Sequence, residues 1–573
     1  MPKRAYPDVP LYRYPWTALS EAAIIAQLDR AAGQAPACAS GLEKGLAGTS
    51  LRIVTDDGGP ALAYEFLSDS RVSFAENGGG KVEAGYGALK LDHLVLIAHI
   101  IPKSLRAYAV VIDERTDLAT VFELWFGGQE AKREVSRAVW QGYRDRGQGS
   151  APEGRHVATN RVEGKALYWK QDAGYETLEY YPSAAYSHFV ELTRLDGRYG
   201  YCGPSDYVRV DEEQYIYTRT ECEFSGIFTA YAMDLNRLEQ IGLRLGFNGA
   251  DELEYYLFRG TGEWLGQIAQ FEKFGDVSGN PVPAPSKAKG DRRVYRPVQT
   301  MPKMTKAQVD AAVAKSTRIF EERSSMAGNG ADPVGDLAGK SFAIHYDGGP
   351  AIEYRFESEE VLQWRKDGKG GWTSARYRAW EGMPGVYLFG HVLEGEPNHD
   401  GHMIVADLDA GLATCFNGYL NTPYFANEAG ARTLRGVVKG EGIPDPGTRR
   451  HAFADELLGR AFTWNYSPGL TSMHLYSTPE TVSWIIFTDD GHGGMEWSGP
   501  GDFVKIRENL FFVYWLEPAC NGTLGTILIN MRTMHDMGIG YHCDEKGLSL
   551  GQVGAHARHA GHFDVQRFFR KEA

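Results

Sequence analysis

The chain lacks the long apolar run that a membrane-spanning helix requires. No stretch approaches the roughly 18 consecutive apolar residues of a span, and the opening residues, MPKRAYPDVPLYRYPW, contain no apolar segment like that of a signal peptide. Basic residues are also outnumbered by acidic ones. The chain has 60 Lys and Arg and 74 Asp and Glu, which gives a net charge of −14. Nucleic acid and anionic membranes are bound by basic surfaces, so the composition predicts no nucleic-acid partner and no membrane partner.

Cysteine is scarce and scattered. The six cysteines are Cys38, Cys202, Cys222, Cys415, Cys520 and Cys543. No two of them form a CxxC pair, so the pattern predicts buried thiols in a reducing compartment and a cytoplasmic protein.

The familiar cofactor fingerprints are missing as well. The sequence has no Walker loop, no G-x-G-x-x-G after a strand and no G-x-S-x-G elbow. His556, His559 and His562 recur at every third residue, whereas zinc-binding helices place histidines at i and i+4. We therefore expect no cofactor and no metal ion.

Glycine and aromatic residues are abundant instead. The chain has 68 Gly and 31 Tyr among 573 residues, and 12% of its residues are aromatic. Many turns together with many aromatic side chains favour short antiparallel strands around an interior. A chain of this length is expected to contain about three to five domains.

The sequence repeats itself. Residues 46–66, LAGTSLRIVTDDGGPALAYEF, match residues 337–356, LAGKSFAIHYDGGPAIEYRF. Residues 202–221, CGPSDYVRVDEEQYIYTRTE, match residues 498–517, SGPGDFVKIRENLFFVYWLE, at nearly the same spacing. Several matches at one spacing predict a tandem duplication.

Each half is predicted to hold a helix followed by two β units. Residues 17–33 and 305–325 have helical composition and spacing, and residues 277–304 form a Pro-rich, basic linker. The expected units are an N-terminal extension with a helix (1–45), β unit 1 (46–150), β unit 2 (151–276), the linker (277–304), a helix with β unit 3 (305–445), and β unit 4 (446–573).

Each half resembles a MoaF-type protein, with an N-terminal and a C-terminal domain in order. The resemblance is carried by GPSD at 203–206 and GPGD at 499–502, the Tyr-rich strand that follows, and the closing glycines from Gly242 and Gly538. It implies an all-β fold of four lipocalin-like (calycin) antiparallel β-barrels in two tandem pairs, with a short helix ahead of each pair. The family name implies a link to molybdenum cofactor or monoamine metabolism.

The fourth unit also resembles phenolic acid decarboxylases, which are small lipocalin-like barrels. The matching stretches are GRAFTWNY (459–466), GGMEWSGPGDFVKI (493–506) and LFFVYWLEP (510–518). In this resemblance Glu517 falls on the catalytic Glu, Tyr466 on the second Tyr and Trp497 on the Trp. Trp464 replaces the first Tyr, and Glu496 stands where the catalytic Arg belongs.

Strand alternation gives the fourth unit a candidate site. Glu517 shares a strand face with Trp515, so an inward-facing carboxyl would lie in a partly dry pocket suited to acid/base chemistry. Tyr466 and Trp464 also share a face and can hold an aromatic substrate by stacking and hydrogen bonding. The alternatives are a strand-end Glu facing solvent and ordinary core packing.

Three further residues are candidates. Glu221 is the counterpart of Glu517 in the second unit, and Arg219 on the same face can position a carboxylate. The alternative there is a structural ion pair. His391 ends an apolar strand, in the place of His99 in the other half, and is either a base or a satisfied core residue.

These features favour a cofactor-independent lyase, either a decarboxylase or a formaldehyde lyase, acting by acid/base catalysis. The expected partner is a small para-hydroxylated aromatic substrate, such as a lignin-derived phenolic. The expected catalytic residues are Glu517, Tyr466, His391 and Glu221, and the expected substrate-binding residues are Trp464, Trp497, Trp515 and Arg219. Two alternatives stay open, a lipocalin-like binding protein without catalysis and a MoaF-type accessory protein. We also expect the two halves to pack as an internal pseudo-dimer, with a homodimer as a further option.

Overall fold

The computed structural model describes most of the chain. The described residues are 19–127, 132–147, 150–183, 186–193, 200–221, 225–268, 303–321, 325–423, 425–486, 496–517 and 522–569. The expected linker up to residue 302, together with Cys222 and Cys520, lies outside them. Within this part the chain is all-β, as the sequence predicts, and the α-helices are α1 (Glu21–Ala32) and α2 (Lys306–Lys315).

Both helices begin at a side-chain cap. The Ser20 hydroxyl accepts the Ala23 N–H at the start of α1, and a capping box with Thr305 opens α2. The helix expected over residues 305–325 is too long, because α2 ends at Lys315 and β19 (Thr317–Ile319) follows at once. Strand β19 pairs in parallel with a C-terminal strand, so tertiary pairing overrides the helical composition.

The first sheet is a closed antiparallel barrel. Its strands are β1 (Ser50–Thr55), β2 (Leu62–Phe66), β3 (Arg71–Glu76), β4 (Val82–Leu91), β5 (Leu94–Ile100), β6 (Arg106–Asp113), β7 (Leu118–Phe126) and β8 (Val135–Arg144). Its interior is aromatic and contains Tyr64, Phe74 and Tyr108.

The second sheet has ten strands and runs in the order β13-β12-β11-β10-β18-β17-β16-β15-β14-β9. The strands are β9 (Val157–Ala158), β10 (Lys165–Gln171), β11 (Glu176–Tyr180), β12 (Tyr186–Glu191), β13 (Gly200–Pro204), β14 (Tyr207–Arg209), β15 (Gln214–Thr220), β16 (Phe228–Asp234), β17 (Glu239–Phe247) and β18 (Leu253–Gln267).

The third sheet has nine strands and runs in the order β23-β22-β21-β20-β28-β27-β26-β25-β24. The strands are β20 (Ser341–Tyr346), β21 (Ala351–Phe356), β22 (Val361–Lys366), β23 (Thr373–Arg376), β24 (Arg378–Met383), β25 (Val386–Val392), β26 (Gly401–Asp407), β27 (Leu412–Tyr419) and β28 (Gly430–Lys439). Phe342, Ile344 and Tyr346 face its core together, as their alternation predicts.

The fourth sheet has eleven strands, including β19. The others are β29 (Ala452–Phe453), β30 (Arg460–Ser467), β31 (Leu470–Thr478), β32 (Thr481–Ile486), β33 (Glu496–Arg507), β34 (Leu510–Leu516), β35 (Leu524–Asn530), β36 (His535–Asp544), β37 (Gly547–Val553) and β38 (His556–His562). The pairing of His535 with His556 brings β36 against β38, which also pairs with β30. Strands β30–β36 and β38 therefore surround one interior.

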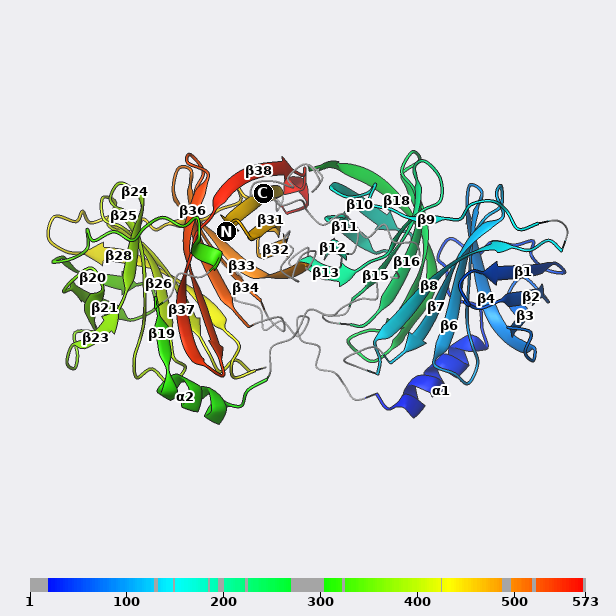
Figure 1. Ribbon diagram of the computed structural model, residues 1–573, viewed down its shortest axis with the longest axis horizontal. Coiled ribbons are helices and arrows are strands. Elements are labelled where there is room, and N and C mark those ends of the chain that lie inside the picture. Colours follow the sequence, from blue (N-terminus) through cyan, green and yellow to red (C-terminus); the bar gives the residue numbers. More distant parts are fainter. Residues whose placement is uncertain are drawn as a thin grey trace.

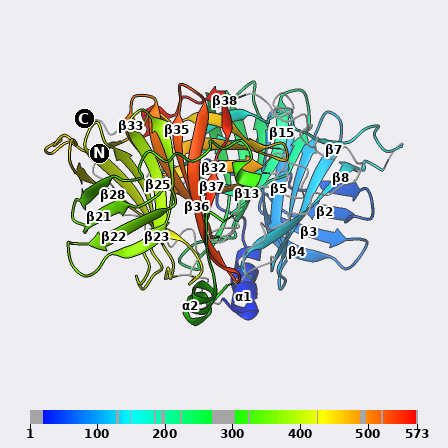
Figure 2. The ribbon, with the colours of Figure 1, turned by 60° about the vertical axis from the view of Figure 1, so that its left-hand side comes forward.

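The two sheets of each half pack through their apolar outer faces, together with a helix. In the first half Phe122 of β7 contacts Phe228 of β16, and Leu28 of α1 joins the same core. In the second half Phe416 of β27 stacks on Phe512 of β34 with ring centroids 4.1 Å apart. Each half is thus one lobe, with its helix at the lower edge (Figures 1 and 2).

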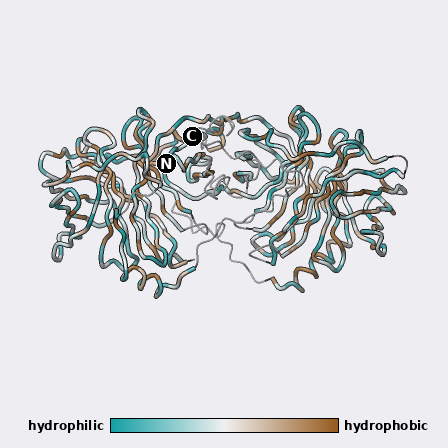
Figure 3. The backbone as a smooth tube through the Cα atoms, viewed as in Figure 1, coloured by the Kyte–Doolittle hydropathy of each residue, from teal (hydrophilic) through white to brown (hydrophobic). Residues whose placement is uncertain are grey.

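The lobes meet in the middle of the molecule through the second and fourth sheets (Figure 1). The Ser498 hydroxyl accepts the Cys202 N–H at 3.1 Å and donates to the Gly200 carbonyl at 3.0 Å. Apolar stretches follow the strands of both lobes, whereas polar stretches gather in the connections (Figure 3). Among the helices of the described residues, none is long and apolar enough to cross a membrane.

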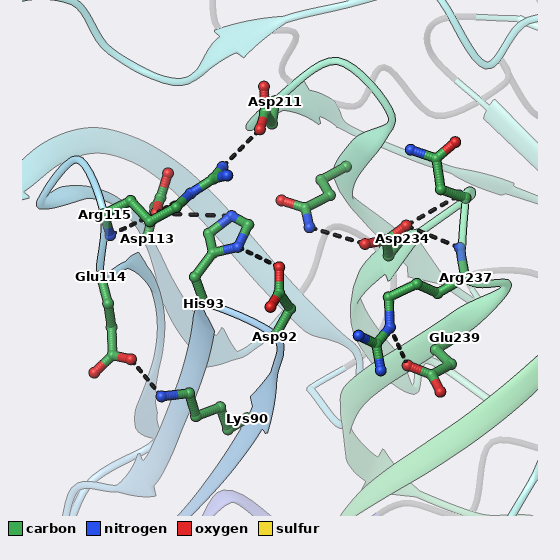
Figure 4. A network of polar contacts seen from close by, with 12 residues as sticks. Lys90, Asp92, His93, Asp113, Glu114, Arg115, Asp211, Asp234, Arg237 and Glu239 are labelled. Carbon is green, nitrogen blue, oxygen red and sulfur yellow. Dashed lines mark hydrogen bonds and ion pairs between the residues drawn. The ribbon is translucent and has the colours of Figure 1, made fainter.

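A polar network also links the first barrel to the second sheet. The Arg115 guanidinium contacts the Asp211 carboxylate at 2.6 Å, and His93 stands beside Asp92 and Asp113 (Figure 4). These groups lie in strand connections, away from the cores of the sheets. The network therefore positions the second sheet against the first.

Candidate binding and catalytic site

The interior of the fourth sheet collects the aromatic residues that the sequence singles out. Because alternate residues of a strand share a face, Phe462, Trp464 and Tyr466 of β30 all point into one core. The same core contains Tyr476 of β31, Trp484 of β32, Trp497 of β33 and Trp515 of β34. The strand alternation thus places Trp464, Tyr466, Trp497 and Trp515 correctly on inward faces. We call this interior the fourth core.

His474 on β31 lies among these rings, although the sequence analysis did not select it. Its ring centroid is 5.8 Å from that of Trp464 and 5.1 Å from that of Trp515. The Tyr466 hydroxyl lies 3.5 Å from its Nε2. Burial lowers the pKa of His474 to about 3, so the ring is neutral at physiological pH. The signal was available, because His474 and Tyr476 alternate on the strand that follows β30.

Glu517 lies at one end of the fourth core, directly after β34. Its side chain is half-buried, and its Oε1 accepts the indole N–H of Trp515 at 2.9 Å. Burial is the main cause of the raised pKa of Tyr466, and the negative charge of Glu517 adds to it. Glu517 is therefore both in contact with the aromatic core and in reach of solvent.

Several buried polar atoms of the fourth core have no hydrogen-bond partner in the described part of the chain. They are the indole nitrogens of Trp464, Trp484 and Trp497, the Tyr476 hydroxyl and Nδ1 of His474. Leaving a buried donor unpaired costs about 1–3 kcal/mol. Such a concentration of unpaired groups is explained if a bound molecule or water completes them.

Asp536 is a further member of the fourth core that the sequence analysis missed. It is fully buried on β36 and pairs with Ile529, whose side chain faces the same interior. Its Oδ1 accepts the Ala555 N–H at 2.6 Å, while Oδ2 has no partner among the described residues. Burial raises the pKa of Asp536 to about 8, so the group is protonated at neutral pH.

Glu496, which stands in the place of the decarboxylase Arg, points away from the fourth core. It precedes the inward-facing Trp497, so strand alternation turns it to the outer face of β33. There its Oε1 accepts from the Cys202 thiol at 3.3 Å, across the junction of the two lobes. Burial raises the pKa of Glu496 to about 8.

Glu221 and Arg219 lie inside the second sheet, in an ion-pair network. Arg244 donates to both oxygens of Glu221, at 2.6 and 3.1 Å, and the Ser225 hydroxyl donates at 2.6 Å. Burial alone raises the pKa of Glu221, but the Arg244 guanidinium outweighs it and lowers the value to about 2. Arg219 donates to Glu179. Glu221 is therefore a fully hydrogen-bonded carboxylate, and it stays ionised near neutral pH.

His391 lies inside the third sheet. Its Nδ1 is 3.2 Å from the Val392 carbonyl and its Nε2 is 3.4 Å from the Tyr354 hydroxyl. Burial lowers the pKa of His391 to about 4. His99 makes the same contact with Tyr64 in the first barrel, at 3.2 Å. The structure thus separates His391 from Glu517, because each belongs to a different core.

The predicted site residues fall into three places. The fourth core unites Glu517, Tyr466, Trp464, Trp497 and Trp515, the second sheet holds Glu221 and Arg219, and the third sheet holds His391. Among the described residues, no three His, Cys, Asp or Glu side chains gather as metal ligands would. His556, His559 and His562 are exposed on β38.

Two family models match the second half of the chain. Residues 324–422 match the MoaF N-terminal domain, and residues 451–562 match the MoaF C-terminal domain. The first match spans most of the third sheet, and the second spans most of the fourth, including the fourth core. The MoaF resemblance is therefore confirmed for residues 324–562. No curated protein matches the chain.

Proposed function

We propose that the fourth core binds a small para-hydroxylated aromatic molecule and that Glu517 makes it a cofactor-independent lyase. The observation that carries the proposal is the position of Glu517, held by an indole N–H at the end of a core full of aromatic rings and unpaired donors. The aromatic faces suit stacking with a ring, and the donors suit its oxygen atoms.

The chemistry needs one group that exchanges a proton with the phenol. Glu517 takes the phenol proton, an electron pair moves through the ring, and the vinyl carbon next to the carboxylate takes up a proton from a water molecule. This step forms a quinone methide and leaves hydroxide. Cleavage of the carbon–carbon bond then returns the pair to the ring and releases carbon dioxide, and Glu517 returns the phenol proton. In a vinyl alcohol the hydroxymethyl group leaves as formaldehyde by the same movement of electrons, and its O–H proton passes to the hydroxide.

The resemblance to phenolic acid decarboxylases supports these roles for Glu517 and Tyr466. Tyr466 is the residue that holds the ring substituent in this proposal. Its hydroxyl lies 3.5 Å from Nε2 of His474, and the charge of Glu517 contributes to its raised pKa, of which burial is the main cause. Glu496 points outward, so among the described residues of β33 no charged group takes the place of the decarboxylase Arg on the inner face. The substrate carboxylate is then held by the neutral donors of the fourth core.

We further infer that the chain is a tandem duplication of a two-barrel unit, with the halves packed as a pseudo-dimer. Contacts recur at matching places, such as Thr120 with His156 and Thr414 with His451, both at 2.9 Å. The Gly226 N–H donates to the Glu221 carbonyl at 2.8 Å, and the Gly522 N–H donates to the Glu517 carbonyl at 3.0 Å. A reducing cytoplasm suits the buried thiols.

A carrier without catalysis is the second candidate. It is favoured by the number of unpaired donors, which bind a ligand without any need for proton transfer. A carrier and a lyase differ in what happens to the ligand, and that difference can be measured directly.

The test is turnover by the purified, metal-stripped protein on 4-hydroxyphenyl acids and alcohols. Mass spectrometry detects the loss of carbon dioxide or formaldehyde. We expect turnover without added cofactor and a loss of at least 100-fold in Glu517→Gln, since general acid/base groups contribute about 10²–10⁴-fold.

The matched control is Glu508→Gln, an exposed Glu in the turn at the other end of β34. It is expected to keep full turnover. Turnover that survives Glu517→Gln contradicts the assigned role, and compounds that bind but stay unchanged support the carrier.

A further inference from the structure

Among the described residues of the fourth core, three of the unpaired buried groups can only donate a hydrogen bond. An indole nitrogen can only donate, and those of Trp464, Trp484 and Trp497 are buried without a partner in the described residues. The Tyr476 hydroxyl is also unpaired there. A ligand that satisfies this interior must therefore supply oxygen acceptors.

Asp536 adds a donor to the same set. Its Oδ1 already accepts the Ala555 N–H at 2.6 Å, as the carbonyl oxygen of a carboxylic acid does. Its Oδ2 is buried with no partner among the described residues, and a carboxylate ion there would lack any cation. Geometry thus assigns the proton to Oδ2, and the O–H lacks an acceptor.

We propose that protonated Asp536 donates a hydrogen bond from Oδ2 to a carbonyl or carboxylate oxygen of the ligand, so that binding requires this proton. The inference rests on the proposed function only in placing the ligand in the fourth core. The inference specifies the ligand class, which is a phenol that also has a carbonyl or carboxylate oxygen. It also specifies that the proton on Asp536 controls how tightly this ligand binds.

Four other titratable groups of the described residues lie in this interior. Tyr466 on β30, Tyr476 and His474 on β31, and Glu517 after β34 share it with Asp536. Burial keeps both tyrosines protonated and keeps His474 neutral. Because the pKa of Asp536 is about 8, the affinity for such a ligand is expected to be constant below that pH and to fall above it, until the gain from this hydrogen bond is lost.

The experiment compares two phenols by isothermal titration calorimetry between pH 6 and 9.5. The first, 4-hydroxyphenylacetamide, has a carbonyl acceptor, and the second, 4-ethylphenol, has none. Neither ionises below about pH 9, since phenols titrate near pH 10. We expect the amide to bind about tenfold more tightly at pH 6, the gain of one hydrogen bond, and to lose this advantage above pH 8.

Two variants test whether Asp536 causes the loss of affinity above pH 8. In Asp536→Asn the side-chain NH₂ still donates but does not titrate, so the amide is expected to bind equally at all pH values. In Glu517→Gln the loss above pH 8 is expected to persist. Affinity of the wild type that is independent of pH, or the same fall in Asp536→Asn, overturns the inference.

The two proposals fail separately. Equal affinity for both phenols, or no binding of the amide at any pH, contradicts the role of Asp536 even if the protein turns over a phenolic acid. Proton-dependent binding without turnover of any compound supports the role of Asp536 and leaves a carrier in place of the lyase.

Discussion

The second and fourth sheets each have a glutamate at the corresponding position, but the hydrogen-bond partners of the two glutamates differ. The matching stretches 202–221 and 498–517 align Glu221 with Glu517 and Arg219 with Trp515. In the second sheet Arg244 occupies both oxygens of Glu221. In the fourth sheet Trp515 stands at the position of Arg219, and its indole N–H donates to Glu517 at 2.9 Å.

The strand pairings show which residues stand at corresponding places in the two sheets. Arg244 pairs with Thr229, and at the corresponding place Gly540 pairs with Gly525. Guanidinium groups that bind a carboxylate favour its charged form, as they do for Glu221. The comparison shows that corresponding strands of the two sheets hold a glutamate through different partners.

The largest expected effect breaks the network of the second sheet. Arg244→Ala leaves Glu221 buried without its main partner, and removing one partner of a buried pair costs about 3–5 kcal/mol. Urea denaturation followed by circular dichroism measures the loss. Arg237→Ala, in an exposed pair on the same sheet, is the control and is expected to leave the midpoint unchanged. A small effect of Arg244→Ala contradicts the structural role.

A comparable effect, spread over about four pH units, concerns Asp536. Its pKa of about 8 in the folded protein exceeds the value near 4 of an unfolded Asp. Its contribution to stability is therefore full below about pH 4 and is lost as pH rises towards 8, by about 1.4 kcal/mol per unit. Asp536→Asn is expected to become more stable relative to wild type between pH 5 and 8.

The exposed Asp564 offers the control for this measurement, since Asp564→Asn removes a carboxylate outside the fourth core. Gln240 occupies the place of Asp536 in the second sheet, pairing with Met233 as Asp536 pairs with Ile529. Gln240→Asp should bring the same pH dependence into the second sheet. Parallel pH curves for wild type and Asp536→Asn would refute the buried acid.

The smallest effect comes from Trp515→Phe. This change keeps most of the ring volume and removes the N–H that Glu517 accepts at 2.9 Å. We expect a loss of stability of about 0.5–1.5 kcal/mol, the net value of one hydrogen bond, and a larger proportional loss of turnover than of binding. Turnover equal to that of wild type would show that Glu517 needs no positioning.

Part of this account follows from the sequence. Alternation along GRAFTWNY and LFFVYWLE predicts the inward faces of β30 and β34, because each strand presents every second residue to one side. The expected units already put Glu221, His391 and Glu517 in three different β units. The order of strands in each sheet depends on distant pairings and could not be predicted. Asp536 was missed for the same reason, as only its pairing with β35 shows which side it faces.

The most direct test of the central claim is a crystal structure of the protein soaked with 4-hydroxyphenylacetamide at pH 6. We expect one ligand inside the fourth core, with its carbonyl oxygen within hydrogen-bond distance of Asp536 Oδ2 and its phenol towards Glu517. We expect no ligand beside Glu221, because Arg244 and Ser225 already satisfy that carboxylate. A ligand inside the second sheet, with the fourth core filled only by its own side chains, would contradict the account.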